Sequence, residues 1–334
     1  MQEIIISKNE EGYKLRKLCL NYLNAAPASF IYKMLRKKNI VLNDKKATGD
    51  EVLKLGDSVK FYMKDETISG FQKNDGSDLK EDIDKNYKQS QKSRNTNTKL
   101  EVIYEDEDFL FVFKPAGVLS QKAKETDYSI NEMIIDYLLN SGAVTNESMK
   151  IFRPSVCNRL DRNTSGLILA AKTPKGAQYL TKQIRERRIK KYYLAAVNDE
   201  FRNIGLHTAY LTKDEKTNKV LISPESTSGS SEIKTKAELI SYDKKLNCSL
   251  LRIELITGKS HQIRAHLAYL GNPIIGDPKY GDAKVNSYFR SEYKVKSQML
   301  MAYAVNFPED DETSLSGKEF MISSREPFTK IFKI

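Results

Sequence analysis

The chain has 334 residues, of which 40% are hydrophobic and 30% charged, a composition typical of a soluble globular protein with two domains. It contains no apolar run of about 18 residues or more, and its first residues lack the pattern of a secretory signal. We therefore expect a cytoplasmic protein that does not span a membrane. Lys and Arg exceed Asp and Glu by 55 to 44, a formal charge of +11, which favours a polyanionic partner such as nucleic acid.

Residues 1–65 are predicted to form a small basic domain. Leucines at helical spacing precede Pro27, and Ser29 is expected to cap a second helix, SFIYKMLRKK. The segments IVLND and VLKLGDSVKFYM are predicted to form strands around polar turns. Residues 1–64 hold 13 Lys or Arg and 7 Asp or Glu. The cations expected on the outer face of the second helix are Lys33, Arg36, Lys37 and Lys38.

These features resemble the S4 RNA-binding domain. The two-helix pattern, the basic end of the second helix and the LGDSVKF segment carry the resemblance. It implies that the four cations bind RNA. The alternative is a generic basic helical hairpin that binds protein or nothing. Residues 66–98 are predicted to be a linker, because the chain from about residue 70 to residue 98 is almost all polar.

Residues 99–334 are predicted to form a second, larger domain. LEVIYEDEDFLFVFK is expected to give two strands around an acidic turn, and TKAELISYD and CSLLRIELIT two paired strands. SINEMIIDYLLNSG and PKGAQYLTKQIRERR have the periodicity of helices, as does KSHQIRAHLAYLG, which Ser260 is expected to cap and Gly271 to end. Strands dominate and helices intervene irregularly, which favours an α+β fold with a largely antiparallel mixed sheet flanked by helices.

Four separated segments carry Asp, Tyr, Arg, Lys or His residues that could serve in catalysis. They are FKPAG (113–117), NRLDRNTSGL (158–167), KKYYLAAV (190–197), and TGKSHQIRAHL (257–267) followed by GNPIIGDPKYG (271–281). In this order they resemble the RluA-type pseudouridine synthases over about residues 99–334. The resemblance implies an isomerase that converts uridine to pseudouridine in structured RNA and needs no cofactor.

Asp161 is the candidate nucleophile. Pseudouridine formation breaks the N1–C1′ bond of uridine and joins C5 to C1′, with no oxidation and no imported group. A carboxylate can trap an electrophilic sugar or base, or remove a sugar proton. The resemblance assigns this role to the Asp of the RLD motif, which is Asp161. Taken alone, Asp161 could equally be a turn residue in a polar loop.

Two further residues complete the expected catalytic set. The resemblance assigns Arg264 as the cation that keeps Asp161 ionised, because a carboxylate beneath a base needs such a partner. It assigns Tyr193 to stack on the extruded uracil. Taken alone, Arg264 could be an ordinary helix-surface residue, and the neighbouring Tyr192 could be the tyrosine that faces the site.

Three residues are expected to contact RNA near this set. The resemblance implies that Arg159 fills the space left by the flipped uridine, although a simple phosphate contact or an ion pair is an alternative. Lys114 and His261 are further candidates for RNA contact. The histidines His261 and His266 are five residues apart, and the three cysteines are widely spaced, so no metal site is predicted.

Two other functions remain open at this stage. The chain could be an RNA-binding or ribosome-assembly factor whose site is unused. It could also be an Asp-dependent glycosidase, which needs a second carboxylate, with Asp277 and Asp282 as loop candidates. By analogy, an S4-like unit favours ribosomal RNA over transfer RNA as the substrate. No feature demands more than a monomer, and Asn158 and Lys259 depart from the usual family motifs.

Overall fold

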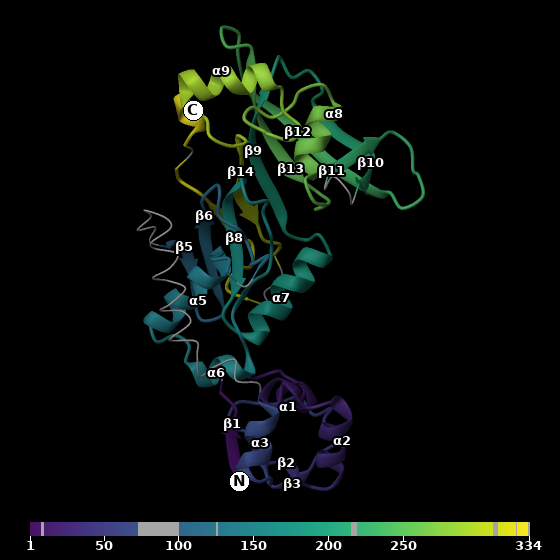
Figure 1. Ribbon diagram of the computed structural model, residues 1–334, viewed down its shortest axis with the longest axis vertical. Coiled ribbons are helices and arrows are strands. Elements are labelled where there is room, and N and C mark those ends of the chain that lie inside the picture. Colours follow the sequence, from purple (N-terminus) through teal and green to yellow (C-terminus); the bar gives the residue numbers. More distant parts are fainter. Residues whose placement is uncertain are drawn as a thin grey trace.

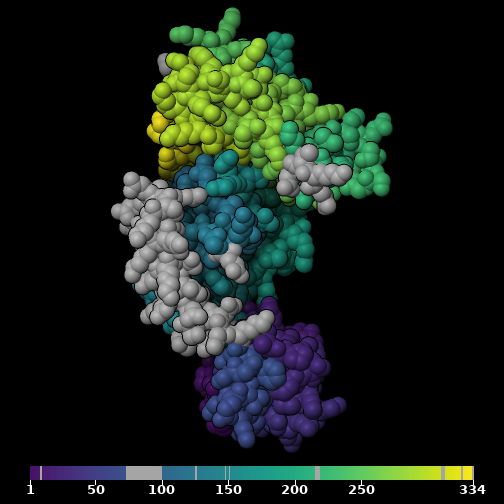
Figure 2. Space-filling view, viewed as in Figure 1, coloured from purple at the N-terminus to yellow at the C-terminus, as the bar shows by residue number. Residues whose placement is uncertain are grey.

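The structure is a computed structural model that describes residues 1–7, 10–72, 100–124, 126–214, 219–309, 313–324 and 326–332. The described residues up to 72 form a compact N-terminal body at one end, and those from 100 on form a longer, larger body (Figure 1). The space-filling view shows the same two bodies meeting at a narrow waist (Figure 2). Most of the expected linker, from residue 73 to residue 98, lies outside the described residues.

The N-terminal body is a four-stranded antiparallel sheet with strand order β1-β4-β2-β3. Three helices pack against it, and their buried side chains, among them Leu18, Ile31 and Ile68, share one core with Phe61 of the sheet. The elements are β1 (Gln2–Ile5), α1 (Leu15–Tyr22), α2 (Ala28–Arg36), β2 (Ile40–Leu42), β3 (Lys45–Lys46), β4 (Ser58–Phe61) and α3 (Asp65–Phe71).

Two sequence expectations for this body were wrong in detail. Helix α2 starts after Pro27, whose extended backbone makes it the N-cap, so Ser29 lies inside the helix and does not cap it. The body also continues beyond residue 65, because the ring of Phe71 in α3 lies 4.5 Å from that of Phe30. Helix α3 is therefore part of the N-terminal core and not of a linker.

The larger body is built on one 11-stranded sheet, and the expectation of an α+β fold with a largely antiparallel sheet is confirmed. Nine strands follow the order β11-β10-β12-β13-β9-β14-β8-β6-β5, while β15 pairs with β14 and β7 with β8. The β14–β8 pair is parallel and the other pairs are antiparallel. The strands are β5 (Glu101–Glu105), β6 (Phe109–Lys114), β7 (Ser155–Val156), β8 (Ser165–Ala171), β9 (Lys190–Asn198), β10 (Gly205–Asp214), β11 (Lys219–Ser223), β12 (Ser231–Asp243), β13 (Cys248–Leu255), β14 (Leu300–Asn306) and β15 (Glu319–Met321).

Helices cover both faces of this sheet. Side chains of α7 (Pro174–Arg185) and α9 (Ala283–Tyr293) belong to the core on one face, with Phe328 of the short helix η1 (Phe328–Lys330). Side chains of α5 (Ile130–Asn140) and α8 (Gln262–Tyr269) belong to the core on the other. Ser129 caps α5 in a reciprocal pair with Glu132, which fixes its start.

The two bodies meet at α6 (Asn146–Ile151). Asn21 in α1 donates its side-chain amide to the carbonyl of Ile151 at 2.7 Å, and the ring of Tyr13 lies 6.5 Å from that of Phe152. Ile151 is buried in the N-terminal core. The contact thus joins the N-terminal body to the end of α6. Across the part of the chain that is described, no helix is long and apolar enough to cross a membrane.

Candidate active site

Asp161 lies in the loop between β7 and β8, where the chain enters the middle of the sheet. The amide of Thr164 donates to the carbonyl of Asp161 at 3.0 Å and closes a turn. Gly166 follows with a φ of +130°, and a Cβ atom there would lie 2.3 Å from the carbonyl oxygen of Ala302 in β14. Only glycine therefore allows β8 to approach β14 this closely, and this approach fixes the base of the loop.

Lys114 anchors the same loop from inside the core, through the carbonyl of Arg162. It has no exposed surface, and its ammonium donates to the carbonyls of Pro115, Val118 and Arg162 at 3.1, 2.7 and 3.1 Å. Burial lowers the pKa of Lys114 to about 7, although the nearby charge of Asp161 opposes this shift. The expectation that Lys114 contacts RNA was wrong, because all three of its donors face protein carbonyls inside the core.

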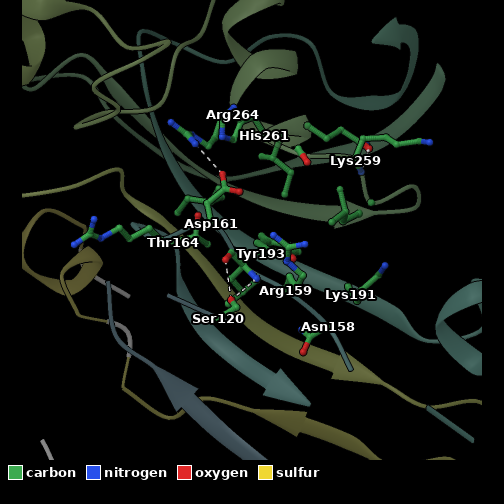
Figure 3. Close-up of a pocket in the computed structure, with 18 of the residues that line it drawn as sticks. Ser120, Asn158, Arg159, Asp161, Thr164, Lys191, Tyr193, Lys259, His261 and Arg264 are labelled. Carbon is green, nitrogen blue, oxygen red and sulfur yellow. Dashed lines mark hydrogen bonds and ion pairs between the residues drawn. The ribbon is translucent and has the colours of Figure 1, made fainter. Parts of the chain in front are cut away.

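Arg264 bridges two carboxylates, as Figure 3 shows for Asp161. Its Nη1 donates to Oδ2 of Asp161 at 2.8 Å, while its Nε and Nη2 donate to the two oxygens of Asp277 at 2.7 and 3.0 Å. Burial opposes the charge on Asp277, but Arg264 lowers the pKa of that carboxyl overall. Burial likewise opposes the charge on Arg264, and the two carboxylates raise its pKa overall. Arg264 therefore stays a cation between two anions.

The start of α8 differs from the expectation. His261 is the N-cap and has a left-handed backbone with a φ of 55°, so Ser260 precedes the helix and does not cap it. The buried side chain of Gln262 accepts hydrogen bonds from Thr257 Oγ1 at 2.9 Å and from the amide of Lys259 at 3.1 Å. This network holds the β13–α8 loop against the sheet and directs Arg264 inward.

His261 lies beside this ion-pair network. Its Nδ1 is 3.0 Å from the hydroxyl of Tyr280. Burial, reinforced by the charges of Arg264 and Lys279, lowers the pKa of His261, although Asp161 opposes the shift. A neutral imidazole near Asp161 can donate or accept a hydrogen bond. The part of the chain that is described holds no group of three His, Cys, Asp or Glu side chains suited to a metal ion.

Tyr193, and not Tyr192, faces Asp161 from β9. Tyr193 is 7% exposed and lines the same cleft as Asp161, and burial together with the Asp161 charge raises its pKa. Tyr192 points to the other face of the sheet, where the guanidinium of Arg252 lies 4.2 Å from its ring centre. The alternation of a strand therefore gives only Tyr193 access to the cleft.

These residues line a cleft of about 1010 Å³. Asp161 is the one carboxylate among the described residues that line it, and Arg159 is exposed at its wall. Its Lys and Arg residues are Arg159, Arg162, Arg185, Arg187, Lys191, Lys259, Arg264 and Lys279. The cleft is thus a positively charged groove around a single anionic side chain, which suits a polyanionic ligand.

The cations expected on the N-terminal helix are not brought to this cleft. Lys33, Arg36, Lys37 and Lys38 are exposed on α2 and just after it. They lie in the other body of the molecule (Figure 1). Among the described residues, the cations of α2 and those of the cleft therefore lie on separate surfaces.

The supporting roles of several residues were not predicted from the sequence. Ser120 accepts from the amide of Leu160 at 2.9 Å and donates to its carbonyl at 2.8 Å, and no motif marked it. Asn158 bonds the backbone of β8 through both ends of its amide. Asp277 was considered only as a glycosidase carboxylate, although its position in GDPKYG could have drawn attention to it.

Comparison with known proteins finds similarity to RNA pseudouridine synthases over most of the chain. The family model for RNA pseudouridylate synthase matches residues 108–269. An uncharacterized RNA pseudouridine synthase of Mycoplasma genitalium is 31% identical over 308 residues, which is 92% of this chain and 89% of the relative. The ribosomal large subunit pseudouridine synthase C of Buchnera aphidicola is 29% identical over 90% of this chain and 88% of its own length.

Two further similarities are narrower. The mitochondrial tRNA pseudouridine(32) synthase of Saccharomyces cerevisiae is 35% identical over 192 residues, covering 57% of this chain and 39% of the relative. The solved structure of human RNA pseudouridylate synthase domain containing 4 superposes with a TM-score of 0.55 at 18% identity, covering 74% of this chain and 95% of that one. This last similarity supports the fold alone.

Proposed function

The chain belongs to the RluA-type family of RNA pseudouridine synthases, and from this premise we propose that it modifies ribosomal RNA by flipping a uridine out and attacking it with Asp161. The observation that carries the proposal is the charge pattern of the cleft. Asp161 is the one carboxylate among its described lining residues, and Arg264 holds it at 2.8 Å. A carboxylate within a basic groove is suited to act on the sugar or base of a bound RNA.

The reaction needs a nucleophile that leaves again. Asp161 attacks C1′ and forms an ester bond to it, the N1–C1′ bond breaks with its electron pair going to N1, and the uracil turns. C5 then bonds to C1′ and displaces the carboxylate, while C5 loses its proton and N1 gains one. Arg264 donates to Asp161 at 2.8 Å and holds the carboxylate in place before the attack and after its release. No atoms are gained or lost overall, so the side chains of the cleft suffice for this sequence.

The base must leave its helix or loop to reach Asp161. Extrusion costs a few kcal/mol, and stacking on an aromatic ring offsets part of that cost. Tyr193 offers its ring at the wall of the cleft. Arg159 is exposed beside it, and a planar guanidinium can stack in the vacated position and bond phosphates. His261 would bond the RNA or orient the loop.

The N-terminal body would add affinity for the folded substrate. Its helices, its sheet and its exposed cations support the S4-like interpretation and an RNA-binding role. The relatives named as acting on the large ribosomal subunit match most of the chain, whereas the one named for tRNA matches 57% of it. This difference in coverage favours ribosomal RNA. That the enzyme is a cytoplasmic monomer stays a prediction from the sequence.

Mapping pseudouridine by carbodiimide and primer extension tests the choice of substrate. Ribosomal RNA and tRNA transcribed in vitro are treated with the enzyme under identical conditions. We expect new stops at defined positions in ribosomal RNA. Stops found in tRNA alone would overturn the ribosomal assignment and leave the isomerase activity in place.

A further inference from the structure

A pair of cations lies on the wall of the cleft away from Arg264. Lys191 is in β9, two residues before Tyr193, so both side chains leave the strand on the same face, about 7 Å apart along it. Arg187 follows the end of α7 and has a left-handed backbone with a φ of 58°. Both residues line the cleft, and Lys191 lies in Figure 3 to the right of Asp161, whereas Arg264 lies above it.

Neither cation has an anionic partner among the described residues. Their side chains take part in no ion pair with Asp or Glu, and the carboxylate of the cleft, Asp161, is already bound by Arg264. Burial, with the charge of Arg187, lowers the pKa of Lys191. Arg187 is exposed and Lys191 is half-buried, so it is the ammonium of Lys191 that costs free energy without a counter-ion in the unliganded protein. Such an arrangement is expected where the counter-ion arrives with the ligand.

The β13–α8 loop passes close to Lys191 without covering it. Gly258 lies in the β13–α8 loop. A Cβ atom added to it would lie 3.8 Å from the ammonium of Lys191. Because Gly258 carries no side chain, nothing from this loop position covers the ammonium. A tetrahedral anion could therefore approach Lys191 from the cleft.

We propose that Lys191 and Arg187 form a phosphate subsite that holds the RNA backbone beside the uridine on Tyr193. The proposal rests on the proposed function, since it takes Tyr193 as the platform for the base. A phosphate of the target strand would give the two cations their missing counter-ion and fix the sugar relative to Asp161. The side chains would act through binding and not through bond breaking.

Binding can be separated from turnover. The substitutions Lys191→Met and Arg187→Gln are made in an Asp161→Asn chain, and the Kd for ribosomal RNA transcribed in vitro is measured from 50 to 300 mM KCl. Losing one charge-assisted contact is expected to raise Kd about tenfold and to reduce the slope of log Kd against log salt by about 0.7 to 0.9. In the chain with Asp161 intact, kcat/KM is expected to fall by about the same factor as Kd rises.

Matched controls are Lys244→Met and Arg290→Gln, which change exposed cations outside the cleft. Unchanged Kd and salt slope in both subsite variants would overturn the proposal, as would a lower kcat with unchanged Kd. Arg187 lies after the end of a helix, so its variant remains informative if Lys191→Met does not fold. If the wild type binds RNA but isomerises none, the proposed function fails, and the Kd values still decide the subsite. If it binds no RNA, both fail.

Discussion

Asp277 and Arg264 form a two-pronged ion pair in which the carboxylate has no exposed surface. Arg264 Nε and Nη2 lie 2.7 and 3.0 Å from the two carboxylate oxygens. The same carboxylate accepts hydrogen bonds from the amides of Lys279 and Tyr280. Asp277 is therefore fixed by its own turn, and it fixes the guanidinium so that Nη1 faces Asp161.

Replacing Asp277 by Ala should impair both stability and turnover. The free energy of unfolding should fall by about 3 to 5 kcal/mol, because the change leaves a buried cation with one partner fewer. The value of kcat should fall at least about tenfold, because Arg264 is no longer held toward Asp161. Denaturant titration and kcat at saturating RNA measure the two effects.

The control is Asp282→Ala in the following turn. Asp282 caps α9 by accepting from the amides of Lys284 and Val285 at 2.8 and 2.9 Å. Its loss should cost about 1 kcal/mol of stability and leave kcat unchanged. A folded Asp277→Ala enzyme with wild-type kcat would show that Arg264 does not need its second carboxylate.

Lys114 predicts a pH dependence of stability. Burial lowers its pKa from 10.5 to about 7 in the folded protein. Between these pH values the unfolded chain binds a proton that the folded chain lacks, so this group's contribution to stability rises with pH. The free energy of unfolding of wild type minus that of Lys114→Met should therefore increase from pH 7 to pH 10. Denaturant titrations across this range measure it, and a constant or shrinking difference would contradict the prediction.

Tyr193 should act first through its ring. Tyr193→Leu removes a stacking surface worth about 1 to 3 kcal/mol per base, so Kd for RNA should rise about fivefold or more. Tyr193→Phe keeps the ring and should retain the wild-type Kd, with any loss of kcat reporting on the hydroxyl. Filter binding and single-turnover kinetics separate the two. Tyr192→Leu, on the other face of β9, is the matched change, and a Kd effect there as large as in Tyr193→Leu would argue against stacking.

The basic end of α2 should contribute affinity and not chemistry. Changing Lys37 and Lys38 together to Ala should weaken RNA binding and lower the salt slope by about 0.7 to 0.9 for each lost phosphate contact, with kcat unchanged. Lys244 and Lys245, an exposed neighbouring pair in the β12–β13 turn, provide the control double variant. Equal Kd values in the two double variants would contradict an RNA-binding role for this surface.

Periodic features of the sequence predicted the helices and strands well. The backbone conformation of single residues, such as the helix caps, was not predicted. The strands around the acidic turn at 106–108 and the helix over 130–140 form as expected, because alternation and a capping box are local signals. The caps at Ser29 and Ser260 were wrong, since Pro27 and His261 take the N-cap conformations instead. Cap identity depends on where the chain turns, which the sequence does not specify.

The motif residues of the site could be predicted from the sequence, but the residues that hold them in position could not. The sequence named Asp161 and Arg264 as a pair, and the structure has them 2.8 Å apart. The burial of Lys114 could not be foreseen, because a lysine before a proline is usually exposed. The role of Asp277 depends on a turn that brings its carboxylate back to α8, a tertiary relationship without a local signal.

Release of tritium from C5 of labelled uridine in ribosomal RNA tests the central claim most directly. Wild type and Asp161→Asn are compared on the same transcripts, with RNA binding measured in parallel. We predict release by wild type and none by Asp161→Asn, which should still bind RNA. Release by Asp161→Asn at the wild-type rate would contradict the assignment of Asp161 as the nucleophile.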